Sequence, residues 1–484
     1  MLYIPKDYQK IGIDFLSARD EAILFAGIGL GKTGMGLETA HIKITNLESK
    51  GFLIVSPLAV TNHQWPKEIQ KFKQFDKHLS FANLRTKEGQ RDFMLGRKAI
   101  YLINYESLPR FCEDMLRGKR YKQWPIDSVI FDELSVAKNH KSRRIVAARP
   151  FIEALERRYG MTGTLMPNGY HDLYGQVGLI DNRKTFGKFI GKFRKEHFES
   201  QQIYLPSGKT QNKYCVTDEG KFKIDKKLSE LVVTLKSSDY LDIPDTENID
   251  VFVKMPKEAR KHYDELEEDL MTLLSGGDSK LDLNDVSDEE LEEFAEDFEE
   301  CDSIVAANAL GLIVKLSQVS SGYAYYGKDR SVAVLHNEKL KALRKIVDND
   351  PTNFLVICQF THEMQAIVEA FPDAELFSTD KIDRWNQRKI RILVCHPLSM
   401  KYGLNMQYGG EAVAWFSFKY SSEQKMQAEG RILRTGQDEF TRVYQIVGAD
   451  TVDEAMIEAV RGKMDGQDAL ADTLSNLLKM RSAA

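Results

Sequence analysis

Hydrophobic residues along the chain are concentrated in short continuous runs, and helix-compatible stretches separate one run from the next. A continuous apolar run that ends in polar residues predicts a strand buried on both faces, as in a parallel sheet. The runs form two sets, at residues 21–26, 51–57, 99–105, 128–134 and 158–164, and at 353–360, 374–378, 390–395, 411–418 and 441–447. We therefore predict an α/β fold with two mostly parallel sheets, each flanked by helices.

The segment between the two sets has a different character. Basic and aromatic residues interleave from about residue 182 to 227, and the chain is strongly acidic from 264 to 302. An acidic run of this kind faces solvent and would repel a polyanion. The pattern predicts an amino-terminal domain over residues 1–180, a helical or irregular insertion over 181–302 and a carboxyl-terminal domain over 303–484.

Composition sets limits on function. The 484 residues carry a net charge of -5, so any nucleic-acid contact has to be a local patch. The five cysteines include no Cys-x-x-Cys pair, which indicates a reducing compartment and gives no zinc site. No apolar run is long enough to span a bilayer, and the first residues lack the layout of a secretory signal. We therefore expect a cytoplasmic protein without a membrane partner.

The first apolar run leads into a glycine-rich loop, Phe-Ala-Gly-Ile-Gly-Leu-Gly-Lys-Thr at residues 25–33, and then into a helix-compatible stretch. Such a loop surrounds a phosphate chain with backbone N–H groups, and the helix N-terminus adds positive potential. Lys32 can reach the β- and γ-phosphates, and the Thr33 hydroxyl can ligate Mg²⁺. The strict pattern has glycine where this chain has Ala26, so the sequence predicts a relaxed phosphate-binding loop.

Two further polar positions fit this chemistry. Asp132 and Glu133 come directly after a Val-Ile-Phe run. Asp132 would hold the metal, usually through water, and Glu133 would polarise the attacking water, although a solvated pair at a strand end has the same sequence. Gln9 lies on a short amphipathic helix before the first run. Its amide suits the edge of an adenine, and the alternative is a surface glutamine.

The interleaved segment and the second set of runs offer other candidates. Between residues 183 and 195 the pattern fits a phosphate-contacting surface with stacking rings, or equally a solvated basic helix face. In the second set, Gln427, Arg431 and Arg434 have near-helical spacing, so they could share one face. Guanidinium groups suit phosphate oxygens, and an arginine from a facing domain stabilises the transition state of phosphoryl transfer. The alternative is a surface helix with pairs such as Glu429 with Arg434.

These motifs together resemble the Snf2-like branch of helicase superfamily 2, over most of the chain. The residues that carry the resemblance are 8–9, 29–33, 54–58 with Trp65, 132–135, 161–168, 402–405 and 427–437. The box after Glu133 reads Leu-Ser where the family has Ala-His, and Leu433 stands where the family usually has His. The compact form is similar to Snf2-like proteins of bacteriophages and prophages.

The resemblance implies two RecA-like lobes that bind ATP and Mg²⁺ between them, with a helical or irregular insertion between the lobes. It implies that the nucleotide is bound by Gln9, Gly29, Leu30, Gly31, Lys32 and Thr33, and the metal by Thr33 and Asp132. Catalysis would use Lys32, Asp132 and Glu133, with Gln427, Arg431 and Arg434 from the other lobe. Nucleic acid would lie across Ser56, Pro57, Thr162, Gly163, Thr164, Gly403 and Asn405.

The resemblance therefore implies an ATP-dependent translocase on double-stranded DNA, working in the cytoplasm of a bacterial host with an unknown phage or host protein as a further partner. A strand-separating DNA or RNA helicase uses the same motifs and stays open, because the sequence shows no separating pin. An ATP-gated clamp with little turnover is the other alternative. The intact Glu133 and both arginines argue against it.

Overall fold

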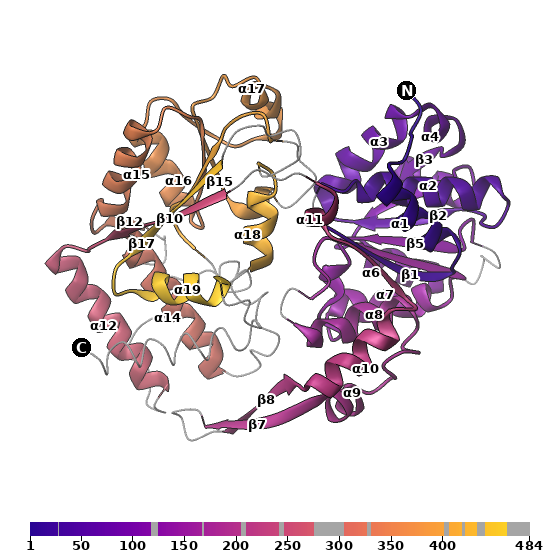
Figure 1. Cartoon of the computed structure of the whole chain (residues 1–484), viewed down its shortest axis with the longest axis horizontal. Coiled ribbons are helices and arrows are strands. Elements are labelled where there is room, and N and C mark those ends of the chain that lie inside the picture. The colour runs from indigo at the N-terminus through magenta and orange to yellow at the C-terminus, as the bar shows by residue number, and fades with distance from the viewer. Residues whose placement is uncertain are drawn as a thin grey trace. The chain divides into compact units, whose positions relative to one another are not determined.

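The structure is a computed structural model of the chain, and it describes residues 1–27, 29–117, 124–166, 169–204, 210–241, 246–274, 304–326, 331–400, 406–418, 422–432 and 441–461. The chain divides into two compact units. Unit 1 contains residues 1–199 and 214–242, and unit 2 contains residues 200–213 and 243–484. Each unit is built around its own sheet (Figure 1).

Unit 1 has a seven-stranded sheet in which the paired strands are all parallel. Its strands, in spatial order, are β3 (Phe81–Asn83), β4 (Ile100–Asn104), β2 (Phe52–Ser56), β5 (Ser128–Asp132), β6 (Arg157–Thr162), β1 (Glu21–Ala26) and β9 (Val232–Leu235). Strands β2, β4 and β5 are buried along their whole length. Burial on both faces explains why their sequences are continuous apolar runs.

Helices cover both faces of this sheet (Figure 1). They are α1 (Asp7–Ser17), α2 (Lys32–Thr45), α3 (Trp65–Lys71), α4 (Lys73–His78), α5 (Lys87–Met94), α6 (Leu108–Arg117), α7 (Arg143–Glu153), α8 (Leu173–Ile180), α9 (Ile190–His197), α10 (Asp218–Leu228) and α11 (Ser237–Tyr240), with short turns η1 (Val60–Gln64), η2 (Leu134–Ala137) and η3 (Tyr170–Asp172).

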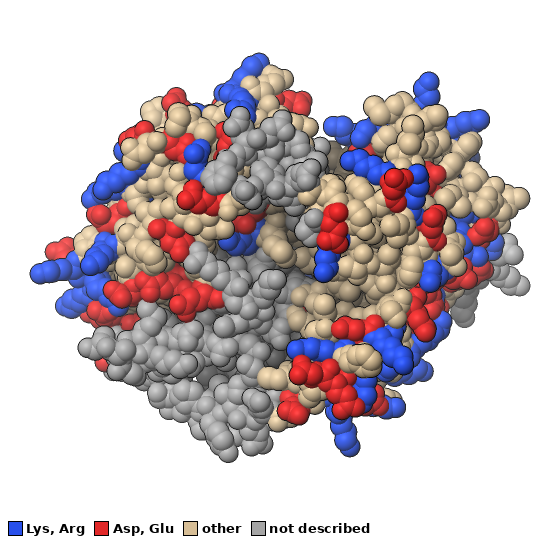
Figure 2. Space-filling model, in the orientation of Figure 1, with Lys and Arg blue, Asp and Glu red and all other residues tan. Residues whose placement is uncertain are grey.

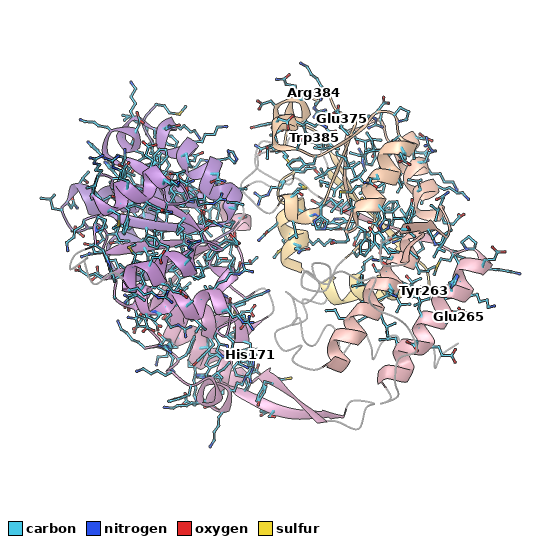
Figure 3. The ribbon with its side chains drawn as sticks, turned by 180° about the vertical axis from the view of Figure 1, so that it is seen from behind. His171, Tyr263, Glu265, Glu375, Arg384 and Trp385 are labelled. Atoms are coloured by element: carbon cyan, nitrogen blue, oxygen red, sulfur yellow. The ribbon has the colours of Figure 1, made fainter. Side chains whose placement is uncertain are left out.

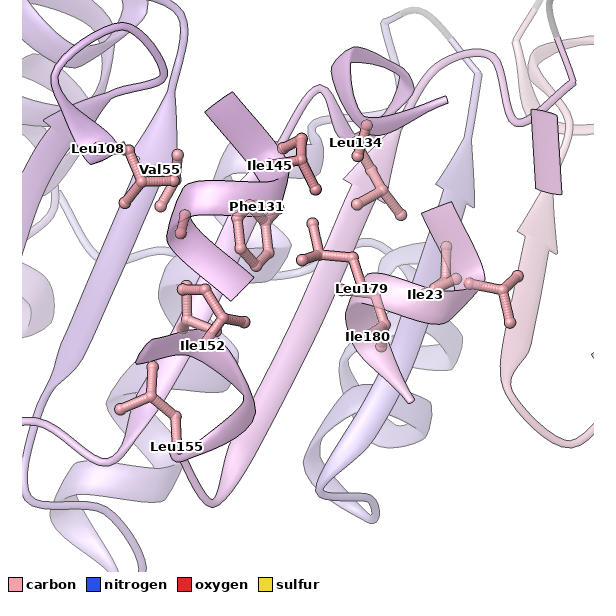
Figure 4. Packing of buried hydrophobic residues seen from close by; sticks show 14 of the residues in the cluster. Ile23, Val55, Leu108, Phe131, Leu134, Ile145, Ile152, Leu155, Leu179 and Ile180 are labelled. Atoms are coloured by element: carbon pink, nitrogen blue, oxygen red, sulfur yellow. The ribbon is translucent and has the colours of Figure 1, made fainter. Parts of the chain in front are cut away.

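The core of unit 1 lies between the sheet and helices α6, α7 and α8 (Figure 4). Val55 and Phe131 project from the strands, and they pack with Leu108, Ile145 and Leu179 from the helices. Each buried side chain of this size contributes about 1.5–3 kcal/mol to folding. This packing holds the carboxyl ends of β5 and β6 in place, where the candidate carboxylates and Thr162 lie.

Unit 2 has a six-stranded parallel sheet. Its strands are β10 (Thr246–Val253), β17 (Thr441–Gly448), β16 (Ala412–Trp415), β13 (Phe354–Ile357), β15 (Ile392–Cys395) and β14 (Ala374–Leu376) in spatial order. Its helices are α12 (Lys257–Leu274), α14 (Ile304–Ser321), α15 (Glu338–Asn349), α16 (Thr361–Ala370), α17 (Ile382–Asn386), α18 (Ser422–Glu429) and α19 (Val452–Arg461), with turns η4 (Thr379–Lys381) and η5 (Pro397–Met400). Two-stranded sheets pair β7 (Phe198–Tyr204) with β8 (Thr210–Val216) and β11 (Tyr323–Tyr326) with β12 (Ser331–Val334).

The predicted α/β class with two mostly parallel sheets is confirmed. The segment predicted as an insertion also contributes to both sheets, because β9 pairs with β1 and β10 pairs with β17. The sheet of unit 2 therefore begins upstream of residue 303. The strand β9 is short, and β10 contains only half-buried and exposed residues, so neither has the pattern of a strand buried on both faces.

The stacking interpretation of the segment at 183–195 is wrong for two of its rings. Phe186 and Phe193 are buried in the core of unit 1 and are not available to bases, whereas Phe189 is 76% exposed. Two of the cations form ion pairs inside unit 1. Arg183 contacts Glu153 at 2.6 Å, and Lys184 contacts Glu21 at 2.7 Å.

Charges of both signs are interspersed over the described residues on the face drawn in Figure 2. In unit 2, Arg384 forms a two-bond pair with Glu375 at 2.8 and 2.9 Å beside the buried Trp385 (Figure 3). Within the described part of the chain, no helix has the length and apolar character needed to cross a membrane.

Candidate functional site

The loop between β1 and α2 has the backbone of a phosphate cradle. Gly29 and Gly31 have φ of 86° and 81°, a left-handed conformation that favours glycine. Gly31 is the N-cap of α2, so the first N–H groups of this helix are directed to the loop. An added Cβ on Gly31 would lie 2.5 Å from Gln9 Nε2. The Gln9 amide therefore leaves no room for a side chain at Gly31. An anion bound by this loop would meet the backbone N–H groups at the start of α2.

Lys32 and Thr33 begin α2, and both make contacts inside unit 1. The Lys32 ammonium donates a hydrogen bond to the Ala26 carbonyl at 2.9 Å, at the start of the loop. The Thr33 hydroxyl is nearly buried and accepts a hydrogen bond from Gln64 Nε2 at 3.0 Å. The ammonium and the hydroxyl thus lie on the first turn of the helix, next to the loop that would hold phosphates.

Gln9 ties α1 to the same loop. Its Oε1 accepts from the backbone N–H of Lys6 at 2.9 Å, and its Nε2 donates to the Leu30 carbonyl at 2.9 Å. Gln9 is buried, so it is not a surface glutamine. Because both ends of the amide have partners in the chain, contact with an adenine would require these bonds to be exchanged. The adenine contact stays a prediction.

Asp132 ends β5, which is separated from β1 only by β6. Its carboxylate is 7% exposed and accepts a hydrogen bond from Trp65 Nε1 at 2.9 Å. Burial, and next the charge of Glu133, raise the pKa of Asp132 to about 6, whereas Lys32 and Trp65 act in the opposite direction. A bound cation would also lower the pKa of Asp132, because it favours the ionised carboxylate.

Glu133 has an unusual backbone, with φ 63° and ψ 61°. A non-glycine residue in this region costs on the order of 1–3 kcal/mol and persists where its surroundings fix it. Here Ser135 Oγ and Thr162 Oγ1 donate to Glu133 Oε1 at 3.1 and 3.2 Å. The Tyr105 hydroxyl donates to the Asp132 carbonyl at 3.0 Å. The Ser135 that departs from the family pattern therefore helps to hold the Glu133 carboxylate.

The residues present fit a magnesium ion. The Thr33 hydroxyl and the Asp132 carboxylate are hard oxygen donors, which Mg²⁺ prefers over nitrogen or sulfur. Each is hydrogen-bonded to one of two consecutive residues, Thr33 to Gln64 and Asp132 to Trp65. This ion usually keeps several waters and takes other ligands from substrate phosphates, so two protein ligands beside a phosphate loop suffice.

The predicted nucleic-acid residues of unit 1 lie at the carboxyl ends of β2 and β6, and their side chains point inward. The Ser56 hydroxyl is buried and 2.7 Å from Thr61 Oγ1. The buried Thr162 hydroxyl shares its single proton between the Thr164 carbonyl at 2.7 Å and Glu133 Oε1 at 3.2 Å. Pro57 is buried as well, and Gly163 is partly exposed. Their contact with nucleic acid stays a prediction, and Gly403 and Asn405 lie outside the described residues.

Unit 2 holds the remaining candidates. Gln427 is on α18, but this helix ends at Glu429, so Arg431 lies in the turn beyond it and not on the helix face. Arg431 is 7% exposed, and its Nε donates to the Met400 carbonyl at 2.9 Å. Glu429 accepts from Trp415 Nε1 at 3.0 Å. Arg434, and with it the alternative pair of Glu429 and Arg434, lies outside the described residues.

Sequence reasoning missed the residues that hold the candidate site residues in place through hydrogen bonds. Gln64 and Tyr105 had no signal of their own, because each acts through a tertiary contact. Ser135 appeared only as a departure from the family pattern, and its bond to Glu133 is local. Trp65 appeared only as part of a motif, and its hydrogen bond to Asp132 joins residues 67 positions apart. An indole N–H in a buried tryptophan usually has a partner, which is the one general signal that could have pointed to it.

No family model matches the chain. It is 27% identical to protein p41 of Acyrthosiphon pisum secondary endosymbiont phage 1, over 98% of this chain and 99% of that protein. It is 24% identical to the ATP-dependent helicase MG018 of Mycoplasma genitalium, over 95% of this chain and 41% of that protein. It is also 24% identical to the SWI/SNF-related matrix-associated actin-dependent regulator of chromatin subfamily A-like protein 1 homolog of Caenorhabditis elegans, over 98% of this chain and 63% of that protein.

Among solved structures, the SWI2/SNF2 ATPase core of Sulfolobus solfataricus in complex with double-stranded DNA aligns with a TM-score of 0.41 at 18% identity, covering 97% of this chain and 94% of that chain. The chain spans less than two thirds of the helicase and of the chromatin regulator. The resemblance to Snf2-like helicases and to their compact phage form is confirmed by the named relatives.

Proposed function

We propose that this protein is an ATP-dependent translocase on double-stranded DNA. The observation that carries the proposal is the arrangement in unit 1. A glycine-rich loop follows β1, and an Asp-Glu pair follows β5, with only β6 between these two strands. Ligands of parallel sheets gather at the carboxyl ends of the strands. The relatives named as an ATP-dependent helicase and an SWI/SNF-related regulator support the same assignment.

In the proposed reaction the loop at residues 27–31 binds the triphosphate, and Lys32 exchanges its bond to Ala26 for the β- and γ-phosphates. Thr33 and Asp132 would hold Mg²⁺, which when bound neutralises charge on the phosphates. Glu133, fixed by Ser135 and Thr162, orients the attacking water.

Gln427, Arg431 and Arg434 of unit 2 would complete the site when the two units close on the nucleotide. Guanidinium groups then stabilise the charge that develops on the transferred phosphoryl group. Because unit 1 contains the phosphate loop and unit 2 the arginines, hydrolysis depends on closure, and each cycle shifts one unit along the DNA.

A basic segment of unit 1 supports binding of a polyanion. Lys138, Lys141, Arg143 and Arg144 follow the Asp-Glu pair, and no acidic residue occurs from 134 to 152. Arg143 and Arg144 are exposed on the first turn of α7, where Arg144 lies 3.5 Å from Glu106 and Arg143 adds to the positive potential of the helix N-terminus. Contacts of this kind go to phosphates and sugars, so sequence preference should be weak.

Two assays side by side test this function. A translocase on duplex DNA displaces the third strand of a triplex in an ATP-dependent reaction and leaves a labelled duplex paired. Unwinding of the duplex without triplex displacement would favour the strand-separating helicase. ATP turnover that is unchanged by any nucleic acid would remove the support for translocation.

A further inference from the structure

The segment that connects β2 to α3 contacts both candidate magnesium ligands. It contains η1, a π-helix over Val60–Gln64, and continues directly into Trp65 at the start of α3. Single π-helical turns are rare and often occur at functional sites. The extra residue of such a turn changes the direction of the side chains that follow. At the end of this turn, two adjacent side chains are directed to two different elements of the site, Gln64 to the start of α2 and Trp65 to the end of β5.

The first contact is between Gln64 and Thr33. Gln64 Nε2 donates to Thr33 Oγ1 at 3.0 Å, and Thr33 is nearly buried. A hydroxyl that accepts a hydrogen bond from an amide keeps its oxygen in one rotamer. The proton and the second lone pair of the Thr33 hydroxyl then point away from Gln64. The Gln64 amide therefore fixes the position of the oxygen that would ligate the metal.

The second contact is between Trp65 and Asp132. Trp65 is fully buried, and its Nε1 donates to Asp132 Oδ2 at 2.9 Å. The ring is confined on its other side, because an added Cβ on Gly36 would lie 3.3 Å from Trp65 Cη2. Pro66 follows in the first turn of α3 and restricts the backbone there. With the ring held on both sides, the indole N–H holds one carboxylate oxygen of Asp132.

The other end of the segment is attached to the sheet. Thr61 is fully buried, and its Oγ1 donates to the Ser56 carbonyl at 3.0 Å and lies 2.7 Å from the Ser56 hydroxyl. The backbone N–H of Thr61 donates to the Pro57 carbonyl at 2.9 Å. The π-turn is thus fastened to the end of β2, next to the expected nucleic-acid contact, and Gln64 and Trp65 extend from a fixed base.

We propose that Gln64 and Trp65 are positioning residues for the metal. They hold the Thr33 hydroxyl and the Asp132 carboxylate in the positions from which both would ligate one Mg²⁺ ion. The proposal rests on the proposed ATPase function. Residues that orient metal ligands in this way typically change metal affinity or activity about 10–100-fold when they are replaced.

The main test is Trp65→Phe, which removes the N–H group and keeps an aromatic ring. The matched control is Trp124→Phe, because the Trp124 N–H finds no hydrogen-bond partner among the described residues. The measurement is the affinity for a fluorescent ADP analogue, once with Mg²⁺ and once with EDTA. We expect Trp65→Phe to reduce the gain in affinity from Mg²⁺ by about tenfold or more, with unchanged affinity in EDTA. Trp124→Phe should behave as wild type.

Gln64→Leu gives a second test that does not depend on the core. It removes the amide donor at a half-buried position. Its control is Gln90→Leu on α5, which removes the hydrogen bond of 2.9 Å from Gln90 Nε2 to the Leu84 carbonyl. We expect Gln64→Leu to raise the Mg²⁺ concentration for half-maximal nucleotide binding and ATPase rate, and Gln90→Leu to leave both unchanged. If Trp65→Phe fails to fold by circular dichroism, Gln64→Leu decides.

The outcomes separate this inference from the function on which it rests. A wild-type protein that binds no nucleotide in either condition contradicts the ATPase proposal. A wild-type protein that binds in a Mg²⁺-dependent way, with Trp65→Phe and Gln64→Leu equal to their controls, overturns the positioning role alone. An equal loss in Mg²⁺ and in EDTA also overturns it, because that loss would mean a general disturbance of the site.

Discussion

Gly31→Ala should damage the phosphate loop through two effects that can be separated. Alanine in the left-handed conformation of Gly31 costs about 1–2 kcal/mol. The new Cβ would also lie 2.5 Å from Gln9 Nε2, so this amide would have to leave the Leu30 carbonyl. A lost hydrogen bond of this kind costs about 0.5–1.5 kcal/mol net. The sum is about 1.5–3.5 kcal/mol, which for a unit of this size lowers the melting temperature by about 3–14 °C.

Gly96→Ala is the control for the backbone effect. Gly96 also has a left-handed φ, of 61°, but an added Cβ there meets only Pro125 at an ordinary contact of 3.5 Å. This variant should lose about 1–2 kcal/mol and keep wild-type ATP turnover. Gly31→Ala should be about 1 kcal/mol less stable than Gly96→Ala and should bind nucleotide more weakly, because the cradle is displaced.

The assay is scanning calorimetry, which resolves units that unfold separately, combined with nucleotide binding. In a double-mutant cycle, Gln9→Ala should remove the steric part, so the two substitutions together should cost less than their sum by about 0.5–1.5 kcal/mol. Strict additivity, with Gly31→Ala as stable as Gly96→Ala and normal nucleotide affinity, would refute the contact between Gln9 and the loop.

Four further predictions concern the chemistry. Lys32→Ala should abolish ATP turnover, and DNA-stimulated hydrolysis by this variant would refute the assignment of the loop. Glu133→Gln should bind ATP and lose hydrolysis in single-turnover assays, and normal turnover would remove its role with water. Because burial raises the pKa of Asp132 from 3.8 to about 6, this carboxyl favours the fold below pH 3.8 and loses that contribution as pH rises through 6. Asp132→Asn should therefore stabilise the metal-free protein by about 3 kcal/mol at pH 7.5 and by little at pH 3.5, and a gain that is independent of pH in thermal melts would contradict it. Arg431→Ala should cut turnover about 10³–10⁵-fold with little loss of nucleotide affinity, and an unaltered rate would place this arginine outside the reaction.

The strands that are buried on both faces could be predicted from the sequence. Strands β2, β4 and β5 are buried on both faces, so their composition is uniform and their positions are readable. The short edge strand β9 was not recognised as a sheet strand, because a short, half-buried strand resembles its surroundings. Of β10, the sequence predicts only the end, as a strand at residues 251–255, because its first residues are polar and half-buried or exposed. The rings of Phe186 and Phe193 illustrate a related error, since their interleaving with lysines suggested a surface although both lie in the core.

In the candidate site, features set by local sequence could be predicted, and contacts between distant residues could not. The positions of the loop glycines, Lys32, Thr33, Asp132 and Glu133 at a loop and a strand end could be predicted, since local sequence determines both, and their roles stay predictions. The contacts that hold them could not, because Gln64 meets Thr33 across 31 residues and Thr162 meets Glu133 across 29. The end of α18 at Glu429 was not predicted either, because Gly430 follows inside a motif whose spacing suggested a longer helix.

The central claim is that this chain couples ATP hydrolysis to double-stranded DNA. The most direct measurement is the steady-state ATPase rate without nucleic acid and with single-stranded DNA, double-stranded DNA or RNA, each beside the Lys32→Ala protein. We expect a low basal rate, strong stimulation by double-stranded DNA and no rate from Lys32→Ala. A rate that is the same in all four conditions, or that persists in Lys32→Ala, would contradict the account.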